Sequence, residues 1–398
     1  MRILIVHNFY EQAGGEDAVV RSEYDLLKKN NQEVFLYQRN NSEIKVLSLP
    51  KKIKFLCELA WSKKIYQDLR EQINKLRPDV VHFHNIFYMI TPSAYDACRD
   101  EKVPVIQSQH NFRPFCSNGL FFRANAVCEE CLEHSLWRGV RYGCFKGSRL
   151  ATLPVARMLM EHQKRGTWNN KIDRYIVAAE FTRQKYIQAG IPAGKISIKP
   201  HFVFPNNSPK TDQGYALYLG RLSEEKGVDV LLKGWETLRD IPLRVIGSGP
   251  LMEKLKIFAQ EKGMTHVHFL GFVSHEQYEL NIKGAKFLVI PSICYENFPR
   301  VVVEAYSYGV PLLASRLGSI KDLVIDKKTG LLFEAGNPRD LADKARWLAQ
   351  HPKEVDQMGR WAREEYDQKY LPQKNYAALM AIYENVIAGY QSKRIRRL

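Results

Sequence analysis

The stretch Phe287-Leu-Val-Ile290-Pro-Ser-Ile-Cys-Tyr-Glu296-Asn-Phe-Pro299-Arg-Val-Val-Val-Glu304 decides the fold of the chain. Its first four residues predict a buried strand, and Pro299 suits the first turn of a helix, where its missing N–H costs nothing. The free amides and dipole of that helix start would bind an anion such as a diphosphate. The Glu304 carboxylate, five residues beyond Pro299, would accept hydrogen bonds from a vicinal diol such as a ribose.

The two carboxylates alone are ambiguous. Glu296 and Glu304 are as readily explained as ordinary polar residues near a helix start. The whole string from strand to helix makes that explanation much weaker, and it favours a ligand site.

Short apolar strands alternate with helical stretches on both sides of this string. This alternation is typical of an α/β fold with parallel sheets. Helices are expected at residues 18–30 and 66–76. The expected strands are residues 3–6, 33–37, 80–83, 105–108 and 175–178 in the first half, and 216–219, 243–246, 267–270, 287–290, 311–314 and 330–333 in the second.

A linker separates the two series of strands. Residues 198–210 contain three prolines and two asparagines, a composition typical of loops. We therefore expect two doubly wound, Rossmann-like domains, residues 1–200 and 201–370. A C-terminal helix and basic tail, residues 371–398, would pack back on the first domain. Ligands bind beyond the carboxyl ends of strands in such sheets, and two facing domains form a cleft.

The chain is basic, with 59 Lys and Arg against 43 Asp and Glu and a formal net charge of +16. The excess is greatest in residues 1–200, which hold 31 basic and 20 acidic side chains. Such a protein favours phosphorylated ligands, an anionic bilayer surface or nucleic acid. No nucleic-acid-binding motif is present, so we expect no nucleic-acid partner. The first residues resemble a buried strand rather than a signal peptide, which predicts a cytoplasmic protein.

The excess is partly concentrated in residues 51–65, where five lysines alternate with apolar side chains. A basic amphipathic segment is typical of a helix that lies on a membrane surface. It is also what a surface helix looks like when it packs its apolar side on its own domain. The sequence leaves both interpretations open.

A second motif runs from Gly220-Arg221 to Lys226-Gly227. A strand is expected to end at Gly220 and a helix to begin near Gly227, so that Arg221 and Lys226 leave a strand-to-helix turn. Two fixed cations there would neutralise a diphosphate leaving group without a metal. An exposed charged loop is the alternative. Near the start of the chain, the adjacent glycines Gly14 and Gly15 would let backbone amides approach a phosphate.

Together these segments resemble the family four (group 1) glycosyltransferases of GT-B fold. The resemblance covers nearly the whole chain. Its motifs are the two glutamates at 296 and 304, the segment 220–227, Gly247-Ser-Gly-Pro250, Gly271-Phe-Val273 and the Gly14-Gly15 loop. Many relatives have Gly where this chain has Pro299, which removes one backbone donor near the transferred sugar.

The resemblance implies a retaining, metal-independent hexosyltransferase that uses a nucleoside-diphosphate sugar, with UDP-glucose as the best match. The acceptor would be a glycan or lipid-linked glycan of exopolysaccharide or envelope synthesis, at the inner face of the cell membrane. A sugar-nucleotide epimerase or hydrolase and a non-catalytic nucleotide-sugar binder are the alternatives. The implied donor-binding residues are Gly14, Gly15, Arg221, Lys226, Phe272, Val273, Glu296, Asn297, Phe298, Val301 and Glu304.

His110 stands just past a strand and matches the family position that contacts the reacting end of the sugar, so the resemblance makes it catalytic together with Glu296. Glu16, His84 and Asn111 are expected on the acceptor side. His82 and His84 leave another strand end, where they would form a cleft wall or, less readily, bind a metal.

Cys116, Cys128, Cys131 and Cys144 lie in an insert of the first domain, residues 112–147. Their spacing suits a structural zinc held by four thiolates. Four scattered, reduced thiols explain the pattern equally well.

Overall fold

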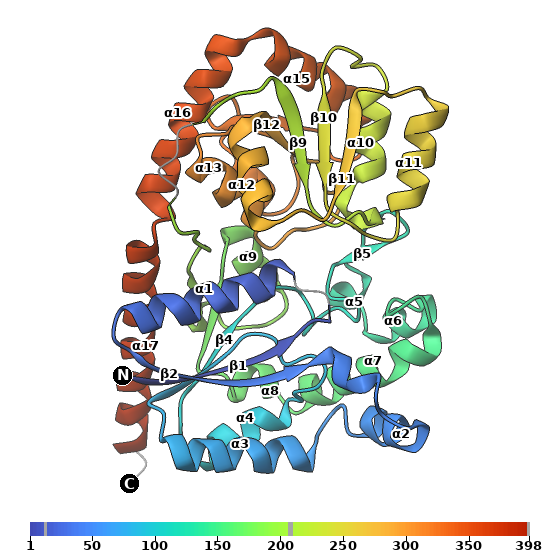
Figure 1. The fold of residues 1–398 in the computed structure, drawn as a ribbon. Coiled ribbons are helices and arrows are strands. Elements are labelled where there is room, and N and C mark those ends of the chain that lie inside the picture. Colours follow the sequence, from blue (N-terminus) through green and yellow to red (C-terminus); the bar gives the residue numbers. More distant parts are fainter. Residues whose placement is uncertain (12–13, 206–209, 396–398) are drawn as a thin grey trace. The chain divides into compact units, whose positions relative to one another are not determined.

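The computed structural model describes residues 1–11, 14–205 and 210–395. Residues 206–209 of the predicted linker, 12–13 before the glycine pair and 396–398 of the predicted tail lie outside this range. The chain divides into two compact units (Figure 1): Met1–Phe121, Cys128–Pro200 and Gln373–Leu398 form the first, and Phe122–Val127 and His201–Pro372 form the second.

The first unit is built on a parallel six-stranded sheet with the order β2-β1-β3-β4-β7-β8. The apolar runs expected to be strands form strands, which confirms the α/β prediction. The strand bounds are β1 Arg2–Phe9, β2 Glu33–Asn40, β3 Val80–Phe83, β4 Val105–Ser108, β7 Arg174–Val177 and β8 Ile196–Ile198. The sequence did not predict β8, since its three residues lie at the sheet edge and only Ile196 is buried.

Helices cover this sheet, and the last of them comes from the far end of the chain. In α17 (Pro372–Ile395), Leu379, Tyr383 and Val386 join the core formed by β1, β3 and β4. The predicted helix at 66–76 starts earlier, because the Ser62 hydroxyl accepts a hydrogen bond from the Ile65 amide and caps the first turn. The other helices are α1 Gly15–Lys29, α2 Leu49–Cys57, α3 Lys63–Leu76, α4 Ser93–Asp100, α5 Glu130–Glu133, α6 Trp137–Tyr142, α7 Arg149–Lys164, α8 Thr167–Asn170 and α9 Glu180–Gln188.

The second unit repeats the architecture, with the parallel strand order β11-β10-β9-β12-β13-β14. Its strands are β9 Tyr215–Leu219, β10 Leu243–Ile246, β11 Val267–Gly271, β12 Ala285–Ile290, β13 Leu312–Ser315 and β14 Gly330–Phe333. Its helices are α10 Val228–Trp235, α11 Met252–Glu261, α12 His275–Gly284, α13 Arg300–Ser307, α14 Ile320–Leu323, α15 Pro338–Gln350 and α16 Pro352–Lys369. A short antiparallel hairpin, β5 Phe122–Arg123 and β6 Ala126–Val127, completes the described strands.

Each sheet contains a point where the strand order reverses direction. In the first sheet this point lies between β1 and β3, and in the second between β9 and β12. The loops that follow the two strands lead to opposite faces of the sheet and leave a crevice beyond the carboxyl ends, where α/β proteins bind ligands. The fold therefore predicts one ligand site at each reversal.

A buried ion pair joins three distant segments of the first unit. Lys199 follows β8, and its Nζ lies 2.5 Å from Oε1 of Glu23 on α1, with both side chains at most 2% exposed. The same ammonium donates to Oδ1 of Asn375 on α17, at 3.1 Å. Loss of either ion would leave the other charge buried without its oppositely charged neighbour.

We predict that Lys199→Met lowers the free energy of unfolding by about 3–5 kcal/mol, because the Glu23 carboxylate stays buried and loses the Lys199 cation. The matched control is Lys45→Met, whose ion pair with Glu11 is exposed, and it should cost less than about 1 kcal/mol. Chemical denaturation of both variants measures the difference. Equal costs would show that the buried pair adds nothing to stability.

Candidate functional site

An ion pair occupies the reversal point of the second sheet. Lys226 lies in the loop after β9, and Glu296 lies in the loop after β12; Lys226 Nζ and Glu296 Oε1 are 2.6 Å apart. Ser292 donates to the same carboxylate oxygen at 2.7 Å, and Ser319 donates to the Glu296 carbonyl at 2.6 Å. Two residues that the sequence predicted to be functional are therefore in direct contact.

Each group of this partly buried pair favours the charged form of the other. Burial alone would raise the pKa of Glu296, but the charge and hydrogen bond of Lys226, with the Ser292 hydrogen bond, hold it below its usual value. Burial likewise opposes the charge on Lys226, yet the Glu296 carboxylate raises the pKa of the ammonium well above its ordinary value. The site therefore presents a fixed cation and a fixed carboxylate.

A close backbone approach holds the two loops together. Gly227 has a φ of +64°, and a Cβ at this position would lie only 2.0 Å from the Pro291 carbonyl oxygen. Gly247, after β10, is restricted in the same way, because its Cβ would lie 1.9 Å from the Gly220 carbonyl oxygen. We conclude that these motif glycines allow the loops after β9, β10 and β12 to pack on one another.

Glu304 lies inside α13, and both of its carboxylate oxygens have partners. Tyr278 of α12 donates to Oε2 at 2.5 Å, and Arg300, one helical turn earlier, lies 3.1 Å from Oε1. Burial and the neighbouring Glu304 raise the pKa of Tyr278 well above its usual value, so this hydroxyl remains a donor. Neither partner was identified from the sequence. Tyr278 is 26 residues away, and the i,i+4 spacing of Arg300 was the signal available for the ion pair.

The start of α13 differs slightly from the prediction. Pro299 is the residue before the helix, with an extended backbone, and Arg300 is the first helical residue. Phe298 is buried, and its ring packs on His201 and Tyr370 of the same unit. The Phe298 ring is therefore part of the packing of this unit, and the roles of Phe298, Asn297 and Val301 in donor binding stay predictions.

The remaining predicted donor residues of this unit lie at other loop ends. Arg221 is exposed directly after β9, and its carbonyl accepts a hydrogen bond from Tyr218 at 2.8 Å. Phe272 and Val273 follow β11, two strands from the reversal point, and the Phe272 ring is 90% exposed. The structure does not bring Phe272 together with Lys226, Glu296 and Glu304.

Histidines gather at the reversal point of the first sheet. His84 follows β3 and His110 follows β4; His84 Nδ1 and His110 Nε2 are 3.0 Å apart, and the rings are stacked. His84 Nε2 lies 3.6 Å from Oε2 of Glu23. Burial lowers the pKa of His84 well below its usual value. A neutral His84 can accept one hydrogen bond, so this geometry orients the His110 ring.

His82 belongs to the same cluster and is fully occupied. Its two ring nitrogens hydrogen-bond to the Tyr383 and Ser108 hydroxyls at 2.7 and 2.8 Å, and burial lowers its pKa to about 4. Within the described part of the chain, Glu23, His82 and His84 are the one trio spaced for a metal ion. The Lys199 ammonium already compensates the charge of Glu23, so the structure favours a pocket wall over a metal site.

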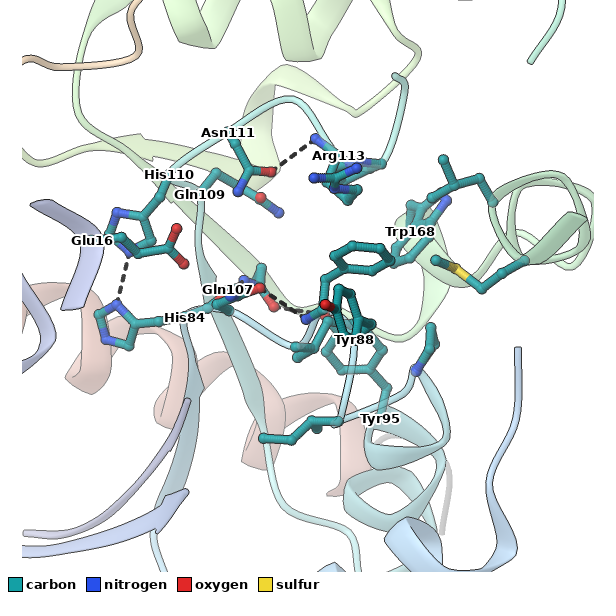
Figure 2. A pocket seen from close by; sticks show the side chains of 18 of the residues that line it. Glu16, His84, Tyr88, Tyr95, Gln107, Gln109, His110, Asn111, Arg113 and Trp168 are labelled. Carbon is teal, nitrogen blue, oxygen red and sulfur yellow. Dashed lines mark hydrogen bonds between the residues drawn. The ribbon is translucent and has the colours of Figure 1, made fainter. Parts of the chain in front are cut away.

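Figure 2 shows the pocket that this wall borders. The predicted residues Glu16, His84, His110 and Asn111 all line it, so the structure brings the acceptor-side set together. Side chains that the sequence reasoning did not select also line it, among them Phe87, Tyr88, Tyr95, Gln107, Gln109, Arg113 and Trp168. Most of them lie far along the chain from the predicted residues, so no local motif connects them to the site. Arg113 is the exception, because a charged residue three positions after His110, in the loop after a strand, could have been selected.

Arg113 gives the pocket a cationic edge beside aromatic rings. Its guanidinium lies 4.3 Å from the centre of the Phe87 ring and 5.6 Å from that of Phe145, and it donates to the Ser117 carbonyl. Cations stack favourably on aromatic faces. A pocket with stacking rings, amides and one guanidinium suits a polar ligand with apolar ring faces, such as a sugar.

Glu16 is the carboxyl group of this pocket. Burial and the neighbouring Asp17 raise its pKa to about 8, although a hydrogen bond from Tyr10 (3.1 Å) and the charge of Arg113 lower it in part. Glu16 is therefore mostly protonated at neutral pH and can donate a hydrogen bond. Beside it, Gly14 and Gly15 begin α1, with open space where side chains would be.

We predict that Arg113→Met raises the pKa of Glu16 further, because a nearby positive charge that favours the ionised carboxylate is lost. Carbon-13 NMR titration of glutamate-labelled protein, assigned with Glu16→Gln, measures the shift. Arg21→Met is the matched control. Arg21 lies in α1, like Glu16, but its guanidinium stacks on the Phe9 ring. A pKa that stays the same or falls in the Arg113 variant would contradict this electrostatic coupling.

The four cysteines of the insert are free thiols near one another. Burial raises the pKa of Cys131 to about 12, with added contributions from Cys116, Cys144 and Cys128. Cys116 donates a hydrogen bond to Asn118 at 2.9 Å. Among the described residues, these sulfurs are not a group within mutual metal-binding distance. The structure does not support the zinc site, which stays a prediction.

Comparison with known families identifies the chain. A model described as glycosyl transferases group 1 matches residues 202–365, and a model described as glycosyltransferase family 4 matches residues 19–206. The chain belongs to this glycosyltransferase family. The resemblance inferred from the motifs is thereby confirmed.

A Methanocaldococcus jannaschii protein described as an uncharacterized glycosyltransferase is 30% identical over 175 residues, which are 44% of this chain and 49% of that protein. The chain spans about half the length of the curated relatives that it matches.

Solved glycosyltransferase structures show the fold to be GT-B. Sucrose-phosphate synthase from Thermosynechococcus elongatus matches with a TM-score of 0.69 and 18% identity, over 98% of this chain and 99% of that chain. HepE of Anabaena, solved in complex with UDP-glucose, matches with a TM-score of 0.65 and 16% identity, over 96% of this chain and 100% of that chain. The predicted fold class, with two Rossmann-like domains, is confirmed; the cleft between them stays a prediction.

Proposed function

We propose that the protein is a retaining glycosyltransferase that moves a hexose, best matched by glucose, from a UDP-sugar to a glycan or lipid-linked acceptor. The ionised Lys226–Glu296 pair at the reversal point of the second sheet, close to the start of α13, carries this proposal. In the donor, the bond between the anomeric carbon of the sugar and the diphosphate breaks. The Lys226 cation would face the diphosphate, and the Glu296 carboxylate would face the anomeric carbon. HepE, which shares the fold, is described in complex with UDP-glucose, and this supports the choice of donor.

The donor diphosphate would lie against Lys226, Arg221 and the free amides at the start of α13. Cations and amides fixed in advance stabilise the negative charge that develops on the leaving group. The ribose would bind Glu304, whose carboxylate already accepts a hydrogen bond from Tyr278 and forms an ion pair with Arg300. The main chain at Phe272 and Val273 would contact the base.

Glu296 would bind the hydroxyls of the transferred sugar through its carboxylate and the adjacent backbone at Asn297. Because Lys226 keeps it ionised, Glu296 also stabilises positive charge as it grows at the anomeric carbon. The donor phosphate would take the proton of the acceptor hydroxyl, so that the leaving group departs from the face on which the acceptor attacks. This route retains configuration and needs no metal, because Lys226 and Arg221 neutralise the diphosphate.

The pocket of the first unit would bind the acceptor. His110 would contact the reacting end of the sugar, held in orientation by His84. Glu16 and Asn111 offer hydrogen-bonding groups, and the aromatic side chains offer stacking surfaces. Gly14 and Gly15, at the start of α1, have open space where side chains would be and would approach a phosphate of the donor. We place the enzyme in exopolysaccharide or envelope-glycan synthesis, on the cytoplasmic side of the membrane.

The assignment of the donor is tested by thermal-shift measurements with UDP, GDP, ADP and their sugars. A ligand at 100 times its dissociation constant adds about 2.7 kcal/mol of stability. UDP and UDP-glucose should raise the melting temperature most. Product analysis with and without an acceptor then shows whether a glycoside forms; free sugar alone in both cases would contradict a transferase.

We predict that Glu296→Gln lowers kcat by about 10²–10³-fold, or roughly 2.7–4 kcal/mol, while UDP affinity is retained. Glu304→Gln should instead weaken UDP binding, because the ribose contact is the same in the ground state and the transition state. Steady-state kinetics with the donor measure kcat for both variants, and calorimetry with UDP measures their UDP affinity.

Glu253→Gln is the matched control for these substitutions, because Glu253 is an exposed residue of α11 in the same unit. It should change neither parameter. The reverse pattern, with UDP binding lost in Glu296→Gln and only kcat lost in Glu304→Gln, would show that the two roles are exchanged.

A further inference from the structure

The helix α2 (Leu49–Cys57) has no buried residue. Leu49, Ile53 and Leu56 follow one another at spacings of four and three, so they share one face of the helix. Their exposed fractions are 72%, 57% and 48%, and Val46 just before the helix is 86% exposed. The apolar face of α2 thus points to solvent, whereas a helix that packed on its own domain would bury it.

The opposite side of α2 attaches the helix to the first unit. Phe55 packs edge-on against Tyr88, with ring centres 6.1 Å apart. Tyr88 also contacts Phe145 at 6.3 Å, and Lys146 lies 5.7 Å from the centre of its ring. Figure 1 shows α2 at the rim of the first unit. The shared contacts with Tyr88 place α2 and the segment leading into α7 on the same side of that unit.

The start of α7 extends the exposed apolar surface. Leu150 is 84% exposed and Leu153 is 41% exposed. Basic side chains accompany these apolar ones along the chain: Lys52 lies beside the apolar face of α2, Lys51 and Lys54 lie on its other faces, and Lys146 and Arg149 precede Leu150. Lys54 forms an ion pair with Glu58. We call this set the docking surface; it comprises Val46, Leu49, Ile53, Leu56, Leu150 and Leu153 with Lys51, Lys52, Lys54, Lys146 and Arg149.

The chemistry of the docking surface fits a bilayer better than a protein. Protein interfaces are depleted of lysine and enriched in aromatic residues, but this surface consists of separate aliphatic side chains flanked by lysines. Such a face inserts its apolar residues at the level of the lipid headgroups, and its cations bind anionic lipids. Within the described residues, no helix is long and apolar enough to cross a membrane.

The docking surface borders the pocket of the first unit. Tyr88, which holds α2 and the segment before α7, also lines that pocket together with Phe87 and Arg113. We propose that the docking surface binds an anionic phospholipid bilayer and so holds this pocket against an acceptor anchored in the same bilayer. The statement about the acceptor rests on the proposed function; the statement about the bilayer does not.

Vesicle flotation with the full chain tests the proposal. The vesicles contain phosphatidylcholine alone, or phosphatidylcholine with phosphatidylglycerol. The protein should bind the anionic vesicles, lose binding as salt rises, and bind neutral vesicles weakly. The triple variant Leu49→Ser, Ile53→Ser, Leu56→Ser and the variant Lys51→Gln, Lys52→Gln, Lys54→Gln should each reduce partitioning by about tenfold or more.

Matched controls come from exposed residues of the second unit. Ile257→Ser with Leu280→Ser, and Lys254→Gln with Lys256→Gln, remove similar side chains from α11 and α12 and should leave partitioning unchanged. Equal binding by the α2 variants and their controls would overturn the proposal. So would an α2 variant that keeps vesicle binding but loses self-association in size-exclusion chromatography, because the surface would then bind a second copy.

UDP calorimetry on the same variants separates this inference from the proposed function. The α2 variants should bind UDP as the unmodified protein does. Normal UDP binding with vesicle binding independent of α2 would refute the docking surface alone. Vesicle binding that depends on α2, in a protein that binds no nucleoside diphosphate, would refute the proposed function alone.

Discussion

The ion pair between Lys226 and Glu296 depends on the reversal of strand order between β9 and β12. In a parallel sheet, the loops after these neighbouring strands lead to opposite faces and leave a crevice beyond the carboxyl ends. Lys226 and Glu296 face each other across it, and Gly227 lets the two loops come close enough for contact. The pair keeps both charges in a partly buried place, where each is stabilised by the other.

The first sheet also has a reversal of strand order, but the residues at its reversal point are histidines instead of an ion pair. At its reversal point, His84 and His110 hydrogen-bond, and behind them Glu23 is compensated by Lys199. These contacts join α1, β8 and α17, so the C-terminal helix helps to fix the floor of the pocket. A histidine pair whose His84 is neutral suits the binding of hydroxyl groups, whereas the charged pair of the second sheet suits a diphosphate and a developing positive charge.

Local patterns in the sequence predicted most of the strands and the position of several site residues. Apolar runs give the strands, and strand ends followed by polar residues indicate where Glu296, Lys226 and His110 lie, because the carboxyl ends of parallel strands share one edge. Interaction partners that lie far apart along the chain form no local sequence pattern. Lys226 and Glu296 are 70 residues apart, and Tyr278 donates to Glu304 from another helix. The outward apolar face of α2 could not be told from an inward one, since periodicity is the same in both cases.

The central claim is that a nucleoside-diphosphate sugar binds at the reversal point of the second sheet. A crystal structure of the protein with UDP tests it most directly. The account predicts density for the diphosphate beside Lys226 and the first amides of α13, with the ribose hydroxyls on Glu304. A diphosphate that contacts neither Lys226 nor the start of α13 would contradict it.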